Sequence, residues 1–226
     1  MPRLPDTGRA AAAPARLERF TRAERWMHHC TAALVGLCVL TAACLYFAPL
    51  AELIGRRQLL VRIHEWAGIL IPIPLLASLM SRAMRTDLRR LNRFGPHDRR
   101  WLAAALGRHR STVGRQAGKF NAGQKLYAAW TAGTVLVMLG TGLMEWFTHL
   151  SPLSLRIGAA FVHEWLAFAV SGVILGHIRK AVRDPEARKG MRTGTVSRSW
   201  AARHHPLWRP GARGTSATAG ERAGGQ

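Results

Sequence analysis

The stretch Ile157–Ile178, IGAAFVHEWLAFAVSGVILGHI, decides the fold. It contains no lysine, arginine or aspartate, and as a helix rising about 1.5 Å per residue it can cross a hydrocarbon layer about 30 Å thick. Three further stretches have a similar length and apolar character, at residues 26–47, 63–81 and 126–144. The sequence therefore predicts an all-α fold, an integral membrane four-helix bundle.

The basic residues are divided unevenly between the segments that join these spans. Of the 33 lysines and arginines, 29 lie in residues 1–25, 82–125 and 179–226, and four lie in residues 48–62 and 145–156. Because positive side chains collect in cytoplasmic segments, we expect a multi-pass protein of the bacterial inner (cytoplasmic) membrane with both termini in the cytoplasm. This topology and contact with anionic membrane lipid explain the net charge of +21, so we expect no nucleic acid partner.

One membrane domain is expected over residues 20–208. Residues 1–19, rich in alanine, arginine and proline, predict a disordered cytoplasmic leader, and residues 209–226, rich in glycine and alanine, predict a disordered tail. Within the second span, Pro72 and Pro74 remove two backbone donors and so predict a kink in that helix.

Four histidines in the spans define two levels. His28 and His177 lie near the cytoplasmic ends of the first and fourth spans, whereas His64 and His163 lie in the outer parts of the second and fourth. From His163 to His177 a helix turns about 1400°, close to four full turns, and rises about 21 Å. The fourth helix therefore offers one imidazole to each level from the same face.

Paired imidazoles between membrane helices favour haem binding. Ionisable side chains inside a membrane normally face a partner, and imidazole is a common axial ligand of haem iron. With both axial positions filled, the iron would serve electron transfer. Interhelical hydrogen bonding and a proton channel use the same residue type and remain alternatives, and zinc is disfavoured because each level has only two histidines. Helical geometry alone does not separate His28 from its neighbour His29.

Four segments carry a more specific signal: RFTRAERWMHH (19–29), RIHEWAGIL (62–70), GKFNAGQK (118–125) and VSRSWAARHHPLW (196–208). Together they resemble the membrane cytochrome b (gamma) subunit of respiratory formate dehydrogenase, in the wider cytochrome b561 group. The resemblance covers nearly everything from Phe20 to Trp208. The Glu24–Arg25 pair of the first segment selects His28 over His29 as the ligand.

The resemblance implies two b-type haems and quinone as substrate. The implied axial ligands of the haem iron are His28, His64, His163 and His177. The implied quinone-binding residues, from the third segment, are Asn121, Gly123 and Gln124. Amide side chains suit a quinone carbonyl because they hydrogen-bond without adding a buried charge. The alternative role of Asn121 is to cap the helix that follows.

The function implied is that of an electron-transfer and quinone-reducing subunit in a respiratory chain. Electrons would come from a catalytic alpha subunit of formate dehydrogenase, through an iron-sulfur beta subunit, and would cross the membrane to quinone. Formate oxidation is assigned to another subunit because this chain has no recognisable molybdenum, tungsten or iron-sulfur ligand cluster. The alternatives are the same dihaem bundle serving a hydrogenase or thiosulfate reductase, and a haem-free transporter or scaffold.

Two further expectations concern charged and tail residues. Arg25, Lys125, Arg179 and Lys180 are candidates to neutralise haem propionates. His204 and His205 are expected to contact a cytoplasmic-side neighbour or lipid.

Overall fold

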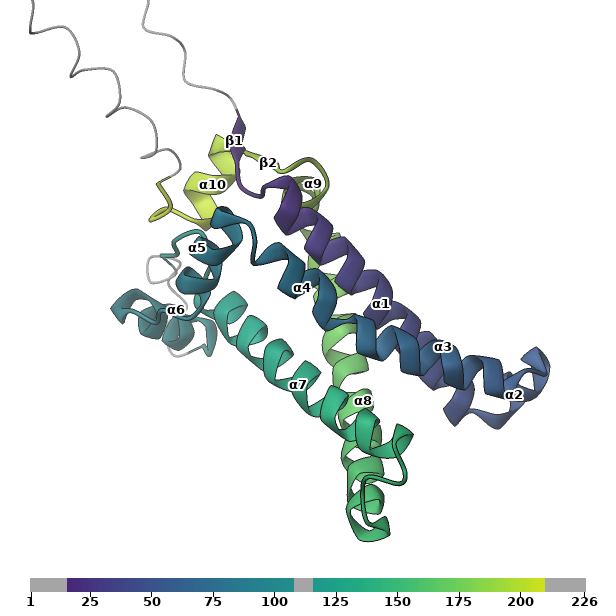
Figure 1. The fold of residues 1–226 in the computed structure, drawn as a ribbon. Helices are drawn as coiled ribbons and strands as arrows, with labels where there is room; N and C mark the ends of the chain where they lie inside the picture. The colour runs from purple at the N-terminus through teal and green to yellow at the C-terminus, as the bar shows by residue number, and fades with distance from the viewer. Residues whose placement is uncertain (1–15, 108–115, 210–226) are drawn as a thin grey trace, which may run out of the picture.

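Four long apolar helices make up most of the chain in the computed structural model, which describes residues 16–107 and 116–209 (Figure 1). The helices with the length and composition to cross a membrane are Arg22–Tyr46, Arg57–Ser78, Ala122–Trp146 and Leu153–Arg183. The prediction of four membrane-length helices is therefore confirmed. Several helices extend beyond the predicted ends, because long arginine side chains at the ends of a helix can reach water while the backbone stays helical.

The helices and strands follow one another in a simple order. They are β1 Arg16–Glu18, α1 Arg22–Tyr46, α2 Ala48–Ile54, α3 Arg57–Leu70, α4 Pro72–Ser78, α5 Arg82–Leu91, α6 Pro96–Ala105, α7 Ala122–Trp146, α8 Leu153–Arg183, α9 Pro185–Thr193, β2 Thr195–Ser197 and α10 Arg198–His204.

The spans associate as two helix pairs. Helix α1 packs along α3 and α4, and α7 packs along α8, with further contacts from α3 to α7 and from α1 to α8. The segments β1, α5, α6, α9, β2 and α10 gather at one end, called here the basic end (Figure 1). The opposite end holds α2 and the connection from α7 to α8, and is called the short-loop end. The two helix pairs diverge toward the short-loop end.

The second span is broken at the position that its prolines predicted. Helix α3 ends at Leu70 and α4 begins at Pro72, with Ile71 joining them. The amide of Ile71 donates to the carbonyl of Gly68 at 3.3 Å, three residues back instead of four. Because Pro72 and Pro74 have no amide proton, the regular hydrogen-bond ladder cannot continue through this segment.

A two-stranded ribbon ties the two ends of the described chain together. Strand β1 pairs antiparallel with β2, with Leu17 opposite Val196. Val196 is fully buried and forms a small core with Trp200 and Ala201, against which Leu17 packs. This ribbon departs from an entirely helical fold, and it places Arg16–Glu18, part of the predicted leader over residues 1–19, in a strand. Residues 1–15 of that leader, and residues 210–226 of the predicted tail, lie outside the described residues.

Candidate functional site

The folded chain brings the four predicted histidines together as two pairs. His64 on α3 faces His163 on α8, with 6.2 Å between the ring centres. His28 on α1 faces His177 on α8, with 6.3 Å between the ring centres. The first pair is called here the short-loop pair and the second the basic-end pair. Helix α8 contributes one ring to each, as its histidine spacing predicts.

The spacing within each pair fits a metal held between two imidazoles. Metal–imidazole bonds are about 2 Å long, and half of each ring adds about 1 Å, so two rings that share one metal have centres about 6 Å apart. The measured 6.2 and 6.3 Å agree with this geometry. Within residues 16–107 and 116–209, no group of three or more His, Cys, Asp or Glu side chains is placed to hold a metal ion. Two axial imidazoles with a macrocycle supplying the remaining ligands suit these sites.

At the short-loop pair, hydrogen bonds fix which ring nitrogen is free. The Nδ1–H of His64 donates to the carbonyl oxygen of Cys38 on α1 at 3.1 Å. A carbonyl oxygen can only accept, so Nδ1 carries the proton and Nε2 keeps its lone pair for a metal. On the other side of the pair, Gly142 makes room for His163, because a Cβ at position 142 would lie 3.3 Å from its Cε1.

At the basic-end pair the rings are held mainly by packing. The Nδ1 atom of His28 is buried and has no hydrogen-bond partner among the described residues. Tyr127 stacks on His177, with 5.2 Å between ring centres and planes 10° apart. His29 is exposed and touches the edge of the His28 ring. His28 is therefore the histidine of the two that faces His177.

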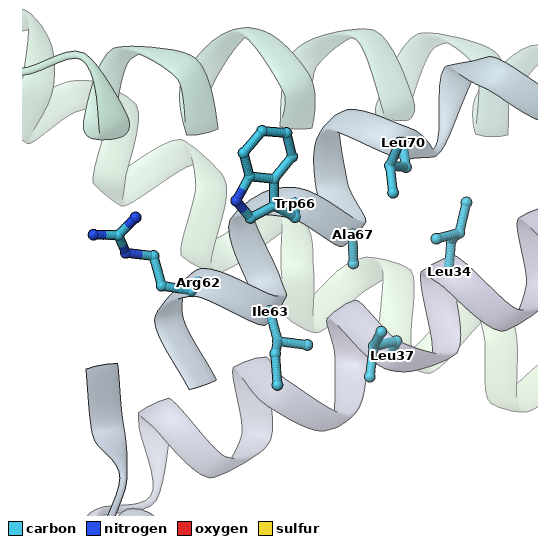
Figure 2. A pocket seen from close by; sticks show the side chains of 7 residues that line it. All are labelled: Leu34, Leu37, Arg62, Ile63, Trp66, Ala67 and Leu70. Carbon is cyan, nitrogen blue, oxygen red and sulfur yellow. The ribbon is translucent and has the colours of Figure 1, made fainter. Parts of the chain in front are cut away.

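An apolar groove of about 310 Å³ lies between α1 and α3 (Figure 2). Its lining residues are Leu34, Leu37, Arg62, Ile63, Trp66, Ala67 and Leu70. Figure 2 shows the indole of Trp66 pointing away from α1. That indole contacts Trp146 of α7 edge to face, with 5.6 Å between ring centres. The contact links the two helix pairs near the short-loop pair.

The three predicted quinone-binding residues lie at the start of α7. Asn121 is the N-cap: its Oδ1 accepts from the amide of Gln124, and Gln124 Oε1 accepts from the amide of Asn121, both at 2.9 Å. This reciprocal capping uses both side-chain oxygens and leaves both NH₂ groups as donors. Trp101 of α6 covers Gly123, since a Cβ there would lie 3.0 Å from its ring.

The same helix connects these amides to the basic-end pair. Tyr127 lies three residues after Gln124, so the two side chains share one face of α7. Because Tyr127 stacks on His177, the amide groups lie about one helical turn from a residue that touches the pair.

Two of the four cations predicted to neutralise propionates have protein partners. The Nζ of Lys125 donates to Asp98 Oδ2 at 2.7 Å and to the carbonyl of Arg93 at 2.8 Å. Arg25 donates to the carbonyl of Arg192. The side chain of Lys125 is 7% exposed, and its ammonium is paired with a carboxylate inside the protein. Arg179 and Lys180 are exposed at the basic end.

Sequence reasoning missed a buried aromatic and cationic cluster at the basic end. The guanidinium of Arg19 lies 4.6 Å from the ring centre of Trp200 and donates to the carbonyl of Lys119 at 3.1 Å. Burial lowers the pKa of Arg19 to about 10, so the group stays charged at neutral pH. His205 donates to the carbonyl of Gly118 at 2.7 Å, and burial lowers its pKa to about 4.

This cluster corrects the expectation for one of the two tail histidines, His205. His205 is 3% exposed and contacts the chain's own Gly118, so it does not face lipid or a neighbouring protein. His204 is exposed and stacks on Trp200. The pairing of the segments 118–125 and 196–208, both singled out in the sequence, was the available signal for this contact.

Known proteins share this sequence pattern. The profile of a family described as Prokaryotic cytochrome b561 matches residues 19–194. The formate dehydrogenase cytochrome b556 subunit of Haemophilus influenzae is 30% identical over 170 residues, which cover 72% of this chain and 68% of the relative. The formate dehydrogenase cytochrome b556(fdo) subunit of Escherichia coli K12 is 26% identical over 197 residues, covering 84% and 90%.

A further relative matches over a shorter region. The cytochrome b556(Fdn) subunit of the nitrate-inducible formate dehydrogenase of Escherichia coli K12 is 34% identical over 94 residues, so the match covers 40% of this chain and 43% of the relative. With the profile match over residues 19–194, the chain belongs to the prokaryotic cytochrome b561 family, which implies b-type haem and a multi-pass membrane protein.

Proposed function

We propose that this cytochrome b561 protein is the dihaem membrane subunit of a respiratory formate dehydrogenase, carrying electrons from an iron-sulfur subunit across the membrane to quinone. The observation that carries the proposal is the presence of two histidine pairs, each with the ring spacing of a shared metal, at two levels of one helix bundle. The names of the relatives, which are formate dehydrogenase subunits, support the choice of complex.

The proposed axial ligands are His64 with His163 and His28 with His177. When bound, b-type haem supplies one-electron oxidation and reduction at an iron whose axial positions are both filled. The protein's part is to hold the four imidazoles at their spacing and to surround them with apolar helices. The half-buried positions of His28, His64 and His163 support this role.

The proposed quinone site lies at the start of α7, beside the basic-end pair. Reduction of a quinone to a quinol consumes two electrons and two protons. The free NH₂ groups of Asn121 and Gln124 would donate hydrogen bonds to a quinone carbonyl, with the backbone of Gly123 close by. The capping contacts hold both amides in place without using these donors.

The proposed orientation puts the basic end in the cytoplasm of a bacterium whose inner membrane holds the protein. The uneven distribution of arginine and lysine supports it. The short-loop end would then face the outer side, where an iron-sulfur beta subunit and a catalytic alpha subunit of formate dehydrogenase would be the partners. Protons for the quinone would come from the cytoplasm.

A spectrum of membranes that contain the protein tests this proposal first. Chemical reduction should give b-type bands with about two haems per chain, and the absence of a Soret band would refute haem binding. Formate should then reduce the same bands. Reduction by hydrogen but not by formate, or oxidation by thiosulfate, would assign the subunit to a different oxidoreductase.

Substitutions at the capping box test the quinone site separately. Asn121→Asp and Gln124→Glu keep the oxygens that cap α7 but remove the NH₂ donors. We expect both variants to keep their haems and to lose at least about tenfold in quinone reduction, since a donor to the carbonyl is lost. Asn121→Ser, which also caps a helix but has no amide, should behave like Asn121→Asp. Unchanged quinone reduction in all three would refute the site.

A further inference from the structure

Two threonines make the same contact in the two helix pairs. Thr41 Oγ1 on α1 lies 2.9 Å from Nδ1 of His64 on α3. Thr141 Oγ1 on α7 lies 2.9 Å from Nδ1 of His163 on α8. In each case the threonine stands on the helix that packs along the helix of its histidine. In both rings of the short-loop pair, Nδ1 therefore contacts a threonine hydroxyl.

Each threonine donates its hydroxyl proton to a backbone carbonyl of its own helix. Thr41 Oγ1 donates to the carbonyl of Leu37 at 2.8 Å, and Thr141 Oγ1 donates to the carbonyl of Val137 at 2.8 Å. A hydroxyl has one proton, so toward the imidazole each oxygen is an acceptor. The Nδ1 atoms must then be the donors, and both Nε2 atoms keep their lone pairs.

A backbone carbonyl on α1 also requires Nδ1 of His64 to be a donor. The single Nδ1–H of His64 is shared between Thr41 Oγ1 and the carbonyl of Cys38, three residues before Thr41, which lies 3.1 Å away. Because a carbonyl cannot donate, the protonation of His64 Nδ1 follows from this group as well.

The two histidines held in this way are the first residues of a repeated triplet, His-Glu-Trp. It occurs at His64–Trp66 in α3 and at His163–Trp165 in α8. Each copy begins with a histidine whose Nδ1 contacts a threonine on the paired helix. The two helix pairs therefore hold the two rings of the short-loop pair with the same threonine contact.

We infer that Thr41 and Thr141 are matched positioning residues that fix the orientation and protonation of the two imidazoles of the short-loop pair, and through them tune the iron bound there. This inference rests on the proposed haem-binding function. A ligand histidine whose Nδ1–H is hydrogen-bonded is a stronger electron donor to its metal and is held at a fixed ring angle. A stronger donor stabilises the oxidised iron, so the threonines lower the reduction potential of this haem.

Among the described residues, no threonine hydrogen-bonds to a ring of the basic-end pair. The Nδ1 of His28 is buried without a partner, and the ring of His177 is stacked on Tyr127. The effect of the threonines is therefore confined to one of the two haems. This difference makes the basic-end haem an internal reference in the same molecule.

The chain offers a matched control threonine. Thr131 lies on α7 and its hydroxyl donates to the carbonyl of Tyr127 at 2.8 Å, the same four-residue pattern as Thr41 and Thr141. No hydrogen bond joins it to a histidine among the described residues. Thr131→Val therefore reproduces the loss of a threonine hydroxyl in a span, at a position with no hydrogen bond to a proposed ligand.

The test is a potentiometric titration of the purified haem-loaded protein, followed by optical and low-temperature electron paramagnetic resonance spectra. In Thr41→Val and in Thr141→Val we expect one haem transition to move to higher potential and its low-spin g values to change, while the other transition stays fixed. The double variant should move it further. Affinity for the same haem should fall by roughly tenfold. Thr41→Ser and Thr141→Ser, which keep the hydroxyl, should restore the native potential.

The other possible results separate a failure of the proposed haem binding from a failure of the proposed role of the threonines. A native protein without haem refutes the proposed function before any variant is made. With two haems bound, unchanged potentials in both valine variants, or an equal shift in Thr131→Val, would overturn the role of the threonines alone. If a valine variant loses haem, the serine variant decides: retention of both haems supports the hydroxyl, and loss of the same haem shows that the methyl group matters instead.

Discussion

At the short-loop pair both imidazole Nδ1 atoms are hydrogen-bonded to the neighbouring helix, whereas at the basic-end pair the Nδ1 of His28 has no partner among the described residues and His177 is stacked on Tyr127. The ring spacings of 6.2 and 6.3 Å are nearly equal. The same residue type at the same spacing is thus supported in two ways. Directional hydrogen bonds fix the first pair, and packing holds the second.

This difference follows the surroundings of each pair. The short-loop pair lies between apolar spans, where a polar ring nitrogen needs a partner because hydrocarbon offers none. The basic-end pair lies near a layer of charged and aromatic groups, formed by α5, α6, α9 and α10, that meets the candidate quinone site. A ring held by packing can adjust its angle more easily than one held by a hydrogen bond. The contrast teaches that α8 presents two equally spaced imidazoles whose rings are held by hydrogen bonds at one end and by packing at the other.

Substitution of the two proposed haem ligands on α8 should have the largest effect on the comparison. His163→Ala should remove the short-loop haem and His177→Ala the basic-end haem, each leaving about one haem per chain, because an axial ligand is lost from one site only. The haem-to-protein ratio and the surviving redox transition measure this. His29→Ala is the control and should keep both haems. Loss of both haems from either α8 variant would show that the two sites fold as one.

Loss of the Lys125 ammonium should weaken the basic end and spare the short-loop pair. Lys125→Met leaves the buried carboxylate of Asp98 without its cation, a loss on the order of 3 kcal/mol in the free energy of unfolding. Thermal unfolding followed by the release of each haem measures the effect, and the basic-end haem should be released first. The exposed Lys189→Met is the control. Equal stability of the two variants would contradict a structural role for the Lys125 pair.

Acidification should destabilise the region around His205 at the basic end, and this effect should be smaller than that of the substitutions above. Burial holds the pKa of His205 at about 4, below its ordinary value of 6.5, so the unfolded chain takes up the proton first. The stability that this residue contributes is complete above about pH 6.5 and is lost as the pH falls toward 4, with about 2 kcal/mol lost by pH 5. Hydrogen exchange, corrected for its intrinsic pH dependence, should show weaker protection of residues 195–208.

A variant without the titrating ring isolates the contribution of His205. His205→Asn keeps a donor to the Gly118 carbonyl, so the hydrogen bond survives while the titration disappears. The difference in protection between this variant and the native chain should shrink between pH 7 and pH 5. Peptides from α3 and from the half of α8 at the short-loop end should respond equally in both proteins. A constant difference across that range would contradict the assignment.

Much of the membrane architecture could be predicted from the sequence. Long apolar stretches, the fourteen-residue histidine spacing and the two prolines of the second span each carry a strong periodic or steric signal. The structure forms the four membrane-length helices, breaks the second at Ile71 and brings the histidines together in the predicted pairs. These features depend on composition and helical geometry within one segment or between neighbouring spans.

The features that were missed depend on contacts between distant short segments. Strands β1 and β2 have three residues each and no periodicity to detect, and Arg19 reaches Lys119 across a hundred residues. Thr41 and Thr141 looked like ordinary small residues in apolar helices. The available signal was their placement 23 and 22 residues before the two His-Glu-Trp copies, which becomes informative only once the helix pairing is known.

The ribbon of β1 and β2 has a consequence for how the chain is made. Its second strand follows the fourth span, so the ribbon can close only after every span has been synthesised. The amides of Arg19 and Phe20 then find their acceptor, the carbonyl of Gly194, at 2.7 and 3.0 Å. Until that moment Arg16–Glu18 cannot pair with Thr195–Ser197. Closure of the ribbon therefore comes after the synthesis of the fourth span, and it joins two strands that lie about 180 residues apart in the sequence.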